Sequence, residues 1–149
     1  MEKISFNTSI NASRETVWAV LWGATTYPQW TSPFCEGSQA ITDWQKGSKV
    51  LFVDATQSGM VSRVAESIPN EYMSFEHLGE VHNGVEDTES EQAKVWAGVH
   101  ENYTLKTAGN STVLLVEMDS AAIPEEFKSY FLNAWPQAMD KIKQLAEAQ

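Results

Sequence analysis

The sequence predicts an α+β fold in which an antiparallel sheet packs against one long C-terminal helix. Two observations carry this prediction. From Pro124 to Gln149 apolar residues recur at intervals of three and four, which is the spacing of one helix face. From Ser38 to Ser120 the chain shows strand-like segments separated by short turn sequences, and short connections join antiparallel strands. The apolar helix face is too large to remain in water, so we expect the sheet to cover it.

The composition is typical of a globular protein with an acidic surface. The chain has 149 residues, enough for a single domain spanning 1–149, and 42% of them are hydrophobic. Ten Lys and Arg against twenty Asp and Glu give a formal net charge of −10. Nucleic acids and anionic membranes attract clustered positive charge. We therefore predict neither a nucleic-acid partner nor a membrane partner.

The start of the chain and its cysteine content indicate where the protein resides. The opening segment MEKISFNTSI alternates polar and apolar residues, which predicts neither a signal peptide nor a membrane span. Cys35 is the single cysteine, so an internal disulfide is impossible and a reducing compartment is indicated. Its neighbours supply no base, and we expect an unreactive thiol. The prediction is a cytoplasmic protein.

The N-terminal part predicts one strand followed by two short helices. Residues 4–10 alternate apolar and polar side chains, which is typical of a strand with one buried face. Asn11 or Ser13 can cap a helix from about Arg14 to Gly23. The segment TTYPQWTSPF then predicts a short second helix and a connecting loop.

Six further strands are predicted before the terminal helix. Turn-forming pairs such as Lys46-Gly47 and Pro69-Asn70 separate them. The predicted strands are Gln39–Trp44, Ser48–Ala55, Gly59–Ile68, Tyr72–Val81, Lys94–Lys106 and Thr112–Asp119.

One connection, from Asn83 to Gln92, is longer than the others. It carries Glu86, Asp87, Glu89 and Glu91, and this charge density favours a mobile, solvated loop. A cation site is the alternative for the same residues.

The terminal helix carries most of the apolar area that needs a partner. Pro124 and the acidic pair Glu125 and Glu126 suit a helix start. The apolar face is formed by Phe127, Phe131, Ala134, Trp135, Ala138, Ile142 and Leu145.

Four segments carry a resemblance to a known family: INASRETVWAVLWGATTYPQW, WQKGSKVLF, VAESIPNEYMSFEH and FLNAWPQAMDKIKQLAE. The chain resembles the START/birch-pollen-allergen superfamily, also called SRPBCC. Within it, the chain is similar to the branch of homologues of the C-terminal domain of the heat-shock-protein ATPase activator. This resemblance implies a helix-grip fold: a seven-stranded antiparallel sheet curls around the C-terminal helix, with a cavity between them. It also implies a role in binding lipids, hormones or polyketides, in assisting chaperones, or in catalysing cyclisation.

One histidine and one carboxylate are candidates for chemistry inside such a cavity. On the predicted strand Tyr72–Val81, His77 has the parity of the apolar side, with Met73, Phe75 and Val81. On the predicted strand Lys94–Lys106, Glu101 shares the apolar parity. Pairing these strands places His77 roughly opposite Val99 or Glu101.

A buried pair of this kind can act as general acid and base near neutral pH. The alternative is that one or both groups only bind water or backbone near the cavity mouth. Ser62 and Ser74 are interpreted as ordinary strand serines, so no Ser-His-acid triad is predicted. His77 and His82 are expected on opposite faces of their strand, and no metal site and no cofactor are predicted.

The six tryptophans divide into two predicted groups. Trp18, Trp30 and Trp135 are expected in the core or the cavity wall. Trp22, Trp44 and Trp96 are expected at exposed rims. An aromatic wall would favour flat apolar ligands, although aromatics also fill ordinary cores.

The leading functional hypothesis is binding of a small hydrophobic ligand between the sheet and the C-terminal helix. An enzyme, cyclase-like or hydrolase-like, using His77 and Glu101 is the alternative from another class. A protein that contacts a chaperone, as the ATPase activator does, is the third hypothesis. No catalytic residue is assigned. The predicted ligand-binding residues are Phe52, Phe75, His77, Val99, Glu101, Tyr103, Phe131 and Trp135.

Overall fold

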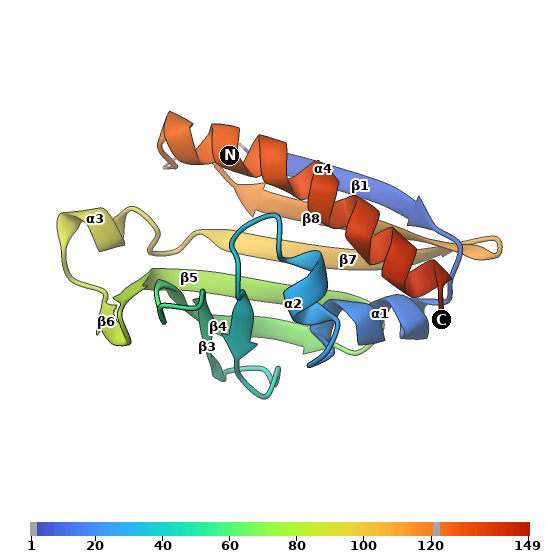
Figure 1. The fold of residues 1–149 in the computed structure, drawn as a ribbon, viewed down its shortest axis with the longest axis horizontal. Coiled ribbons are helices and arrows are strands. Elements are labelled where there is room, and N and C mark those ends of the chain that lie inside the picture. Colours follow the sequence, from blue (N-terminus) through green and yellow to red (C-terminus); the bar gives the residue numbers. More distant parts are fainter. Residues whose placement is uncertain (1–2, 121–122) are drawn as a thin grey trace.

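The computed structural model describes residues 3–120 and 123–149. Within these ranges the elements follow in the order β1 (Lys3–Ile10), α1 (Arg14–Trp22), α2 (Tyr27–Trp30), β2 (Gln39–Ile41), β3 (Lys49–Val53), β4 (Gly59–Ile68), β5 (Tyr72–His82), β6 (Val85–Asp87), α3 (Glu91–Lys94), β7 (His100–Ala108), β8 (Ser111–Asp119) and α4 (Glu125–Glu147). Figure 1 shows α4 crossing the sheet diagonally, with α1 and α2 beside it.

The sheet has the strand order β1-β8-β7-β5-β4-β3-β2, and every pair in it is antiparallel. The short strand β6 pairs with β5 outside this path. The predicted helix-grip fold is therefore confirmed, with seven strands along the path and β6 as an eighth. Among the described residues, no helix combines the length and the apolar character needed to cross a membrane.

The helix α4 buries the face that its periodicity predicts, but only along part of its length. Its buried side chains are Ala134, Trp135, Ala138, Met139, Ile142 and Ala146. Phe127, in the first turn, stays 37% exposed, and Phe131 is half-buried. The later turns of α4 are thus packed into the core, whereas the first turns retain access to solvent.

The helix α1 fills the space beside the later turns of α4. Ser13 caps it, because its hydroxyl accepts a hydrogen bond from the Thr16 backbone N–H at 3.2 Å. Val17 and Leu21 are fully buried, and Trp22 is 8% exposed. The expectation that Trp22 lies at an exposed rim is wrong, because its ring contacts Trp44, Phe75 and Tyr103.

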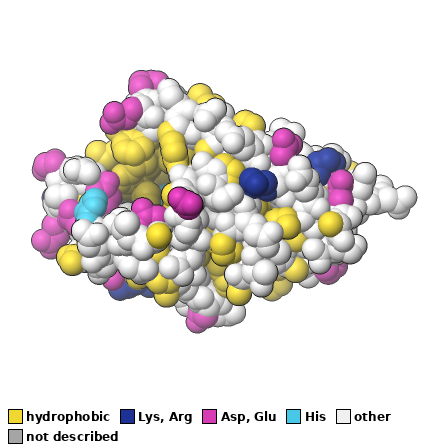
Figure 2. Space-filling view, in the orientation of Figure 1, with side chains coloured by type: hydrophobic (Ala, Val, Ile, Leu, Met, Phe, Trp, Pro, Cys, Tyr) yellow, Lys and Arg dark blue, Asp and Glu magenta, His cyan; other side chains and the backbone are white. Residues whose placement is uncertain are grey.

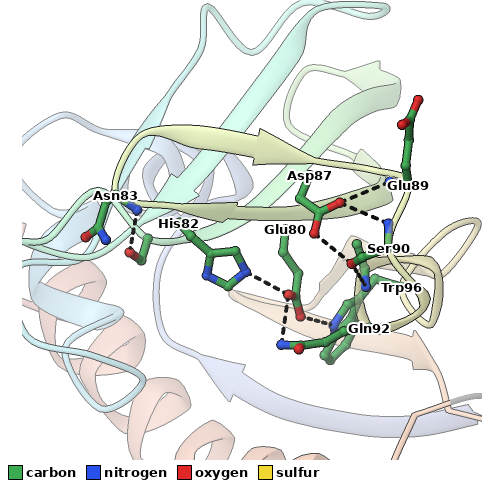
Figure 3. Close-up of polar contacts among 10 residues, drawn as sticks. Glu80, His82, Asn83, Asp87, Glu89, Ser90, Gln92 and Trp96 are labelled. Carbon is green, nitrogen blue, oxygen red and sulfur yellow. Dashed lines mark hydrogen bonds and ion pairs between the residues drawn. The ribbon is translucent and has the colours of Figure 1, made fainter.

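The segment between β5 and β7 differs from the prediction. The predicted mobile loop 83–92 contains β6 and the start of α3, and the predicted strand 94–106 begins only at His100. Local hydrogen bonds explain the change: Ser90 caps α3, and the Asp87 carboxylate accepts from the backbone N–H groups of Glu89 and Ser90 (Figure 3). Gly98 then turns the chain with a φ of +84°.

The strand β5 carries a bulge in its middle. Gly79 and His77 pair with the consecutive residues Val61 and Ser62, so Leu78 is left without a partner on β4. An extra residue of this kind exchanges the faces that the following side chains occupy.

The bulge changes which side chains reach the interior. Glu80 and His77 line the same cavity although they lie three residues apart. Val81, which strict alternation placed beside His77, is absent from that wall. Gly79 allows the close approach of β6, since a Cβ atom there would lie 2.3 Å from the Asp87 carbonyl oxygen.

Candidate ligand-binding cavity

A cavity of about 340 Å³ lies between the sheet and the first half of α4. Figure 2 shows a hollow with a hydrophobic lining on this face of the molecule, and acidic side chains lie around it. Aromatic side chains are the largest group in the wall. Its aromatic members are Tyr27, Trp30, Phe34, Phe52, Trp96, Tyr103, Phe127, Tyr130, Phe131 and Trp135.

Trp135 is the centre of this wall. It is 2% exposed, and its ring centroid lies 6.0 Å from that of Trp30, 5.0 Å from that of Phe34 and 5.9 Å from that of Tyr103. The Tyr130 hydroxyl donates a hydrogen bond to the Phe34 backbone oxygen. These contacts join α4, the chain after α2 and the strand β7 into one aromatic surface.

A chain of hydrogen bonds crosses the polar side of the cavity. Ser62 Oγ lies 2.7 Å from His77 Nδ1, and His77 Nε2 lies 3.2 Å from Glu101 Oε1. The Tyr103 hydroxyl donates to Glu101 Oε2. An ionised carboxylate only accepts, so Nε2 of His77 carries the proton and Nδ1 accepts the Ser62 proton when the ring is neutral.

Burial and the adjacent Glu101 charge raise the pKa of Tyr103 well above its ordinary value, so the phenol stays protonated and remains the donor. The chain is thereby fully paired, apart from the further lone pairs of the Glu101 carboxylate. Glu101 has 14% of its side chain exposed and belongs to the cavity wall. It is the member of the chain that can accept another hydrogen bond.

Ser62 is more than the ordinary strand serine that we predicted, but it is not a nucleophile. It is fully buried and does not belong to the cavity wall. The connectivity is also the reverse of a hydrolase triad, in which the serine contacts Nε2 and the acid contacts Nδ1. The hydroxyl instead fixes the orientation of the His77 ring.

A second carboxylate, Glu80, organises one end of the cavity (Figure 3). It accepts hydrogen bonds from Gln92 Nε2 and Trp96 Nε1, both at 3.1 Å, and His82 Nε2 lies 3.0 Å from it. The Trp96 ring then packs against Phe127 at 5.2 Å between centroids. Glu80 therefore fixes the wall residue that faces the start of α4.

Burial also shifts the pKa of two groups in the cavity wall. The pKa of Tyr27 is raised well above its ordinary value by burial, with smaller contributions from Glu101 and Cys35. Burial raises the pKa of the Cys35 thiol, so this residue stays a thiol at neutral pH. Within the described ranges, no three His, Cys, Asp or Glu side chains are grouped so that they could hold a metal ion.

Six of the eight predicted ligand-binding residues lie in the cavity wall: Phe52, His77, Glu101, Tyr103, Phe131 and Trp135. Phe75 and Val99 do not, and their placement needs correction. Phe75 is fully buried among other aromatic rings. Val99 precedes β7 and packs with Trp96, Met118 and Ile123 in a separate cluster.

Sequence reasoning missed Glu80 and misplaced Trp96, which is 4% exposed and not a rim residue. A signal for Glu80 was present: a glycine inside a predicted strand, here Gly79, is typical of a bulge or a close backbone approach. No comparable signal existed for Trp96, because its position depends on α3.

The family described as activator of Hsp90 ATPase homolog 1-like protein matches residues 11–147. The chain belongs to this family. The predicted membership of the START-like superfamily, and of this branch within it, is thereby confirmed. No curated protein matches the chain in sequence.

Solved structures of other proteins share the fold at low sequence identity. The Aha1 dimer from Colwellia psychrerythraea has a TM-score of 0.75 at 18% identity, over 99% of this chain and 97% of that one. Protein MLL2253 from Mesorhizobium loti has a TM-score of 0.75 at 14% identity, over 99% and 98%. CalU16 from Micromonospora echinospora has a TM-score of 0.68 at 14% identity, over 97% and 65%.

Proposed function

We propose that this member of the family of activator of Hsp90 ATPase homolog 1-like proteins binds a small hydrophobic ligand in the cavity beneath the first half of α4. The observation that carries the proposal is the cavity itself, about 340 Å³ in volume, with aromatic side chains as the largest group in its wall. Pockets for small molecules are concave, mostly apolar and contain a few placed polar groups. Glu101 and Tyr103 are such groups here.

The packing of α4 supports this proposal. Its buried later turns anchor the helix, while Phe127, Tyr130 and Phe131 stand at the cavity with partial exposure. Aromatic surface left in contact with water costs free energy, so a bound apolar molecule would stabilise this arrangement. Phe52, Phe131 and Trp135 would contact the ligand body.

Native mass spectrometry of freshly purified protein tests for a carried molecule. Titration with N-phenyl-1-naphthylamine, a neutral probe that fluoresces in apolar surroundings, tests the cavity directly. Met60→Trp places an indole into the space from β4 and should weaken probe binding about tenfold or more. Leu132→Ala is the matched control, because Leu132 is 54% exposed on α4 and outside the wall.

Two results would contradict the proposal. One is an absence of both a carried molecule and displaceable probe binding. The other is unchanged binding in a Met60→Trp protein that thermal melting shows to be folded.

An enzyme that uses His77 and Glu101 is the competing function from another class. Both ring nitrogens of His77 are already paired and the side chain is 4% exposed, so proton transfer to a ligand would have to pass through Glu101. Turnover that is lost in His77→Ala while binding is retained would favour the enzyme. Stimulation of an Hsp90 ATPase by the purified protein would favour the partner role that the family description names.

A further inference from the structure

The charged side chains of the cavity wall all have one sign. The wall contains the carboxylates of Asp54, Glu80 and Glu101, and within residues 3–120 and 123–149 no Lys or Arg belongs to it. In Figure 2 acidic side chains border the hollow, and the basic side chains visible on this face lie away from it. A molecule that enters the cavity therefore meets negative charge at the mouth and on the wall.

The three carboxylates are not equally free to bind a ligand. Glu80 already has three partners, His82, Gln92 and Trp96. Asp54 accepts from the backbone and side chain of the turn that follows β3, which lowers its pKa. Glu101 has one partner on each oxygen, and a carboxylate offers about four lone-pair sites. Glu101 thus has acceptor capacity directed at the cavity.

The cavity wall also contains a tyrosine hydroxyl without a protein partner in the described part of the chain. Tyr27 is 8% exposed and lines the cavity, and none of the described residues pairs with its hydroxyl. Burial, and after it the charge of Glu101, raise the pKa of Tyr27 well above its ordinary value, so the phenol stays protonated. A hydroxyl that lines a cavity and has no protein partner can bind a polar group of the ligand.

We propose, resting on the proposed function, that the ligand is a hydrophobic amine whose protonated nitrogen binds beside Glu101 and Tyr27. An ammonium group donates up to three hydrogen bonds, and Glu101 and the Tyr27 oxygen can both accept. The surrounding Trp and Tyr faces add favourable cation–π contacts. A carboxylic acid of the same shape is rejected, because it would be buried beside Glu101 without a cationic partner.

Three probes with one ring system test this selectivity at pH 7: 2-naphthylmethylamine, which is cationic, 2-naphthylmethanol, which is neutral, and 2-naphthoic acid, which is anionic. Each competes with N-phenyl-1-naphthylamine for the wild-type protein. We expect the amine to bind at least about tenfold more tightly than the acid, and the affinity of the alcohol to lie between the two. The alcohol measures the hydrophobic contribution alone.

Glu101→Gln should remove the advantage of the amine over the alcohol while it leaves alcohol binding within about threefold of wild type. Glu117→Gln is the matched control, since Glu117 lies on β8 outside the wall and its loss changes the net charge equally. Tyr27→Phe should weaken the amine more than the naphthoic acid.

The outcomes separate the two proposals. Binding of the neutral probes without preference for the amine would overturn only this inference, as would an amine advantage that Glu101→Gln leaves unchanged. Binding of none of the probes would overturn the proposed function as well. If Glu101→Gln does not fold, the ranking of the three probes on the wild-type protein decides the matter.

Discussion

The helices α1, α2 and α4 cover one face of the sheet. The two ends of this face have similar apolar residues, but the helices fill the space over them differently. At one end α1 and the later turns of α4 close the space, and Val17, Leu21 and Ile142 are fully buried. At the other end α1 has stopped, α2 has only four residues, and the cavity remains. His77, Glu80 and Glu101 all lie at this open end.

The length of the covering helices therefore decides where a site forms on this sheet. Polar side chains on β5 and β7 would be costly under a closed helix layer. Beside a cavity they can pair with one another and with a ligand. The same face of the sheet therefore carries the closed core at one end and the cavity at the other.

Removing the residue that joins the two ends should have the largest effect. Trp135 packs against Phe6 in the core and lines the cavity. We expect Trp135→Ala to lower the free energy of unfolding by about 3–5 kcal/mol, through lost burial and a new void. Chemical denaturation checks this value. A loss under about 1 kcal/mol would mean that the helix face is oriented differently.

Two substitutions on α4 should affect stability and ligand binding differently at the two ends. Ile142→Ala, in the closed end, should cost about 2–5 kcal/mol of stability and leave probe binding nearly unchanged. Phe131→Ala, at the open end, should cost about 1 kcal/mol or less and weaken probe binding. Unfolding curves and probe titrations of both proteins provide the measurements. Equal stability losses would contradict the distinction between the two ends.

The third prediction concerns the wall segment held by Glu80. Glu80→Ala removes the acceptor of the Gln92 and Trp96 side chains and should cost about 1–3 kcal/mol. Amide hydrogen exchange should increase in residues 91–96 while β8 stays protected. Unchanged exchange in residues 91–96 would show that α3 is held by other contacts.

The smallest expected effect lies at the far end of α4. Hydrogen bonds from the Asn11 backbone N–H and from Lys143 hold the pKa of the exposed Glu147 below its ordinary value. A carboxylate whose pKa is lower in the folded state stabilises the protein at pH values above its unfolded-state pKa of about 4.3. This stabilisation is lost as the pH falls through the folded-state pKa. Melting temperatures below about pH 5 should therefore decline slightly less steeply in Glu147→Gln than in wild type. An identical decline would contradict this contribution.

Much of the fold follows from periodicity. The face of α4, the alternation along β1 and the pairing of β5 with β7 are local patterns or follow from short connections. The proximity of His77 and Glu101 depends only on parity and approximate register, and the structure places these side chains 3.2 Å apart. Whether they contact a ligand stays a prediction.

The remaining parts of the site depend on contacts between distant residues. Leu78 forms a bulge next to Gly79, which β6 approaches closely, and the positions of Glu80 and Val81 follow from that bulge. Trp96 reaches the cavity because α3 forms, although residues 94–99 carry a strand-like alternation. Tertiary contacts override such short local preferences.

The attachment of the segment that carries Trp96 also affects how the family can diversify. Residues 83–99 attach mainly to β5. β6 pairs with residues 80–82, the His77 backbone forms hydrogen bonds with Gly98 and Val99, and the Glu80 side chain binds Gln92 and Trp96. The strands behind it pair with one another independently of its composition. During evolution this segment can therefore gain, lose or exchange residues, and alter the wall of the cavity, while the rest of the sheet keeps its register.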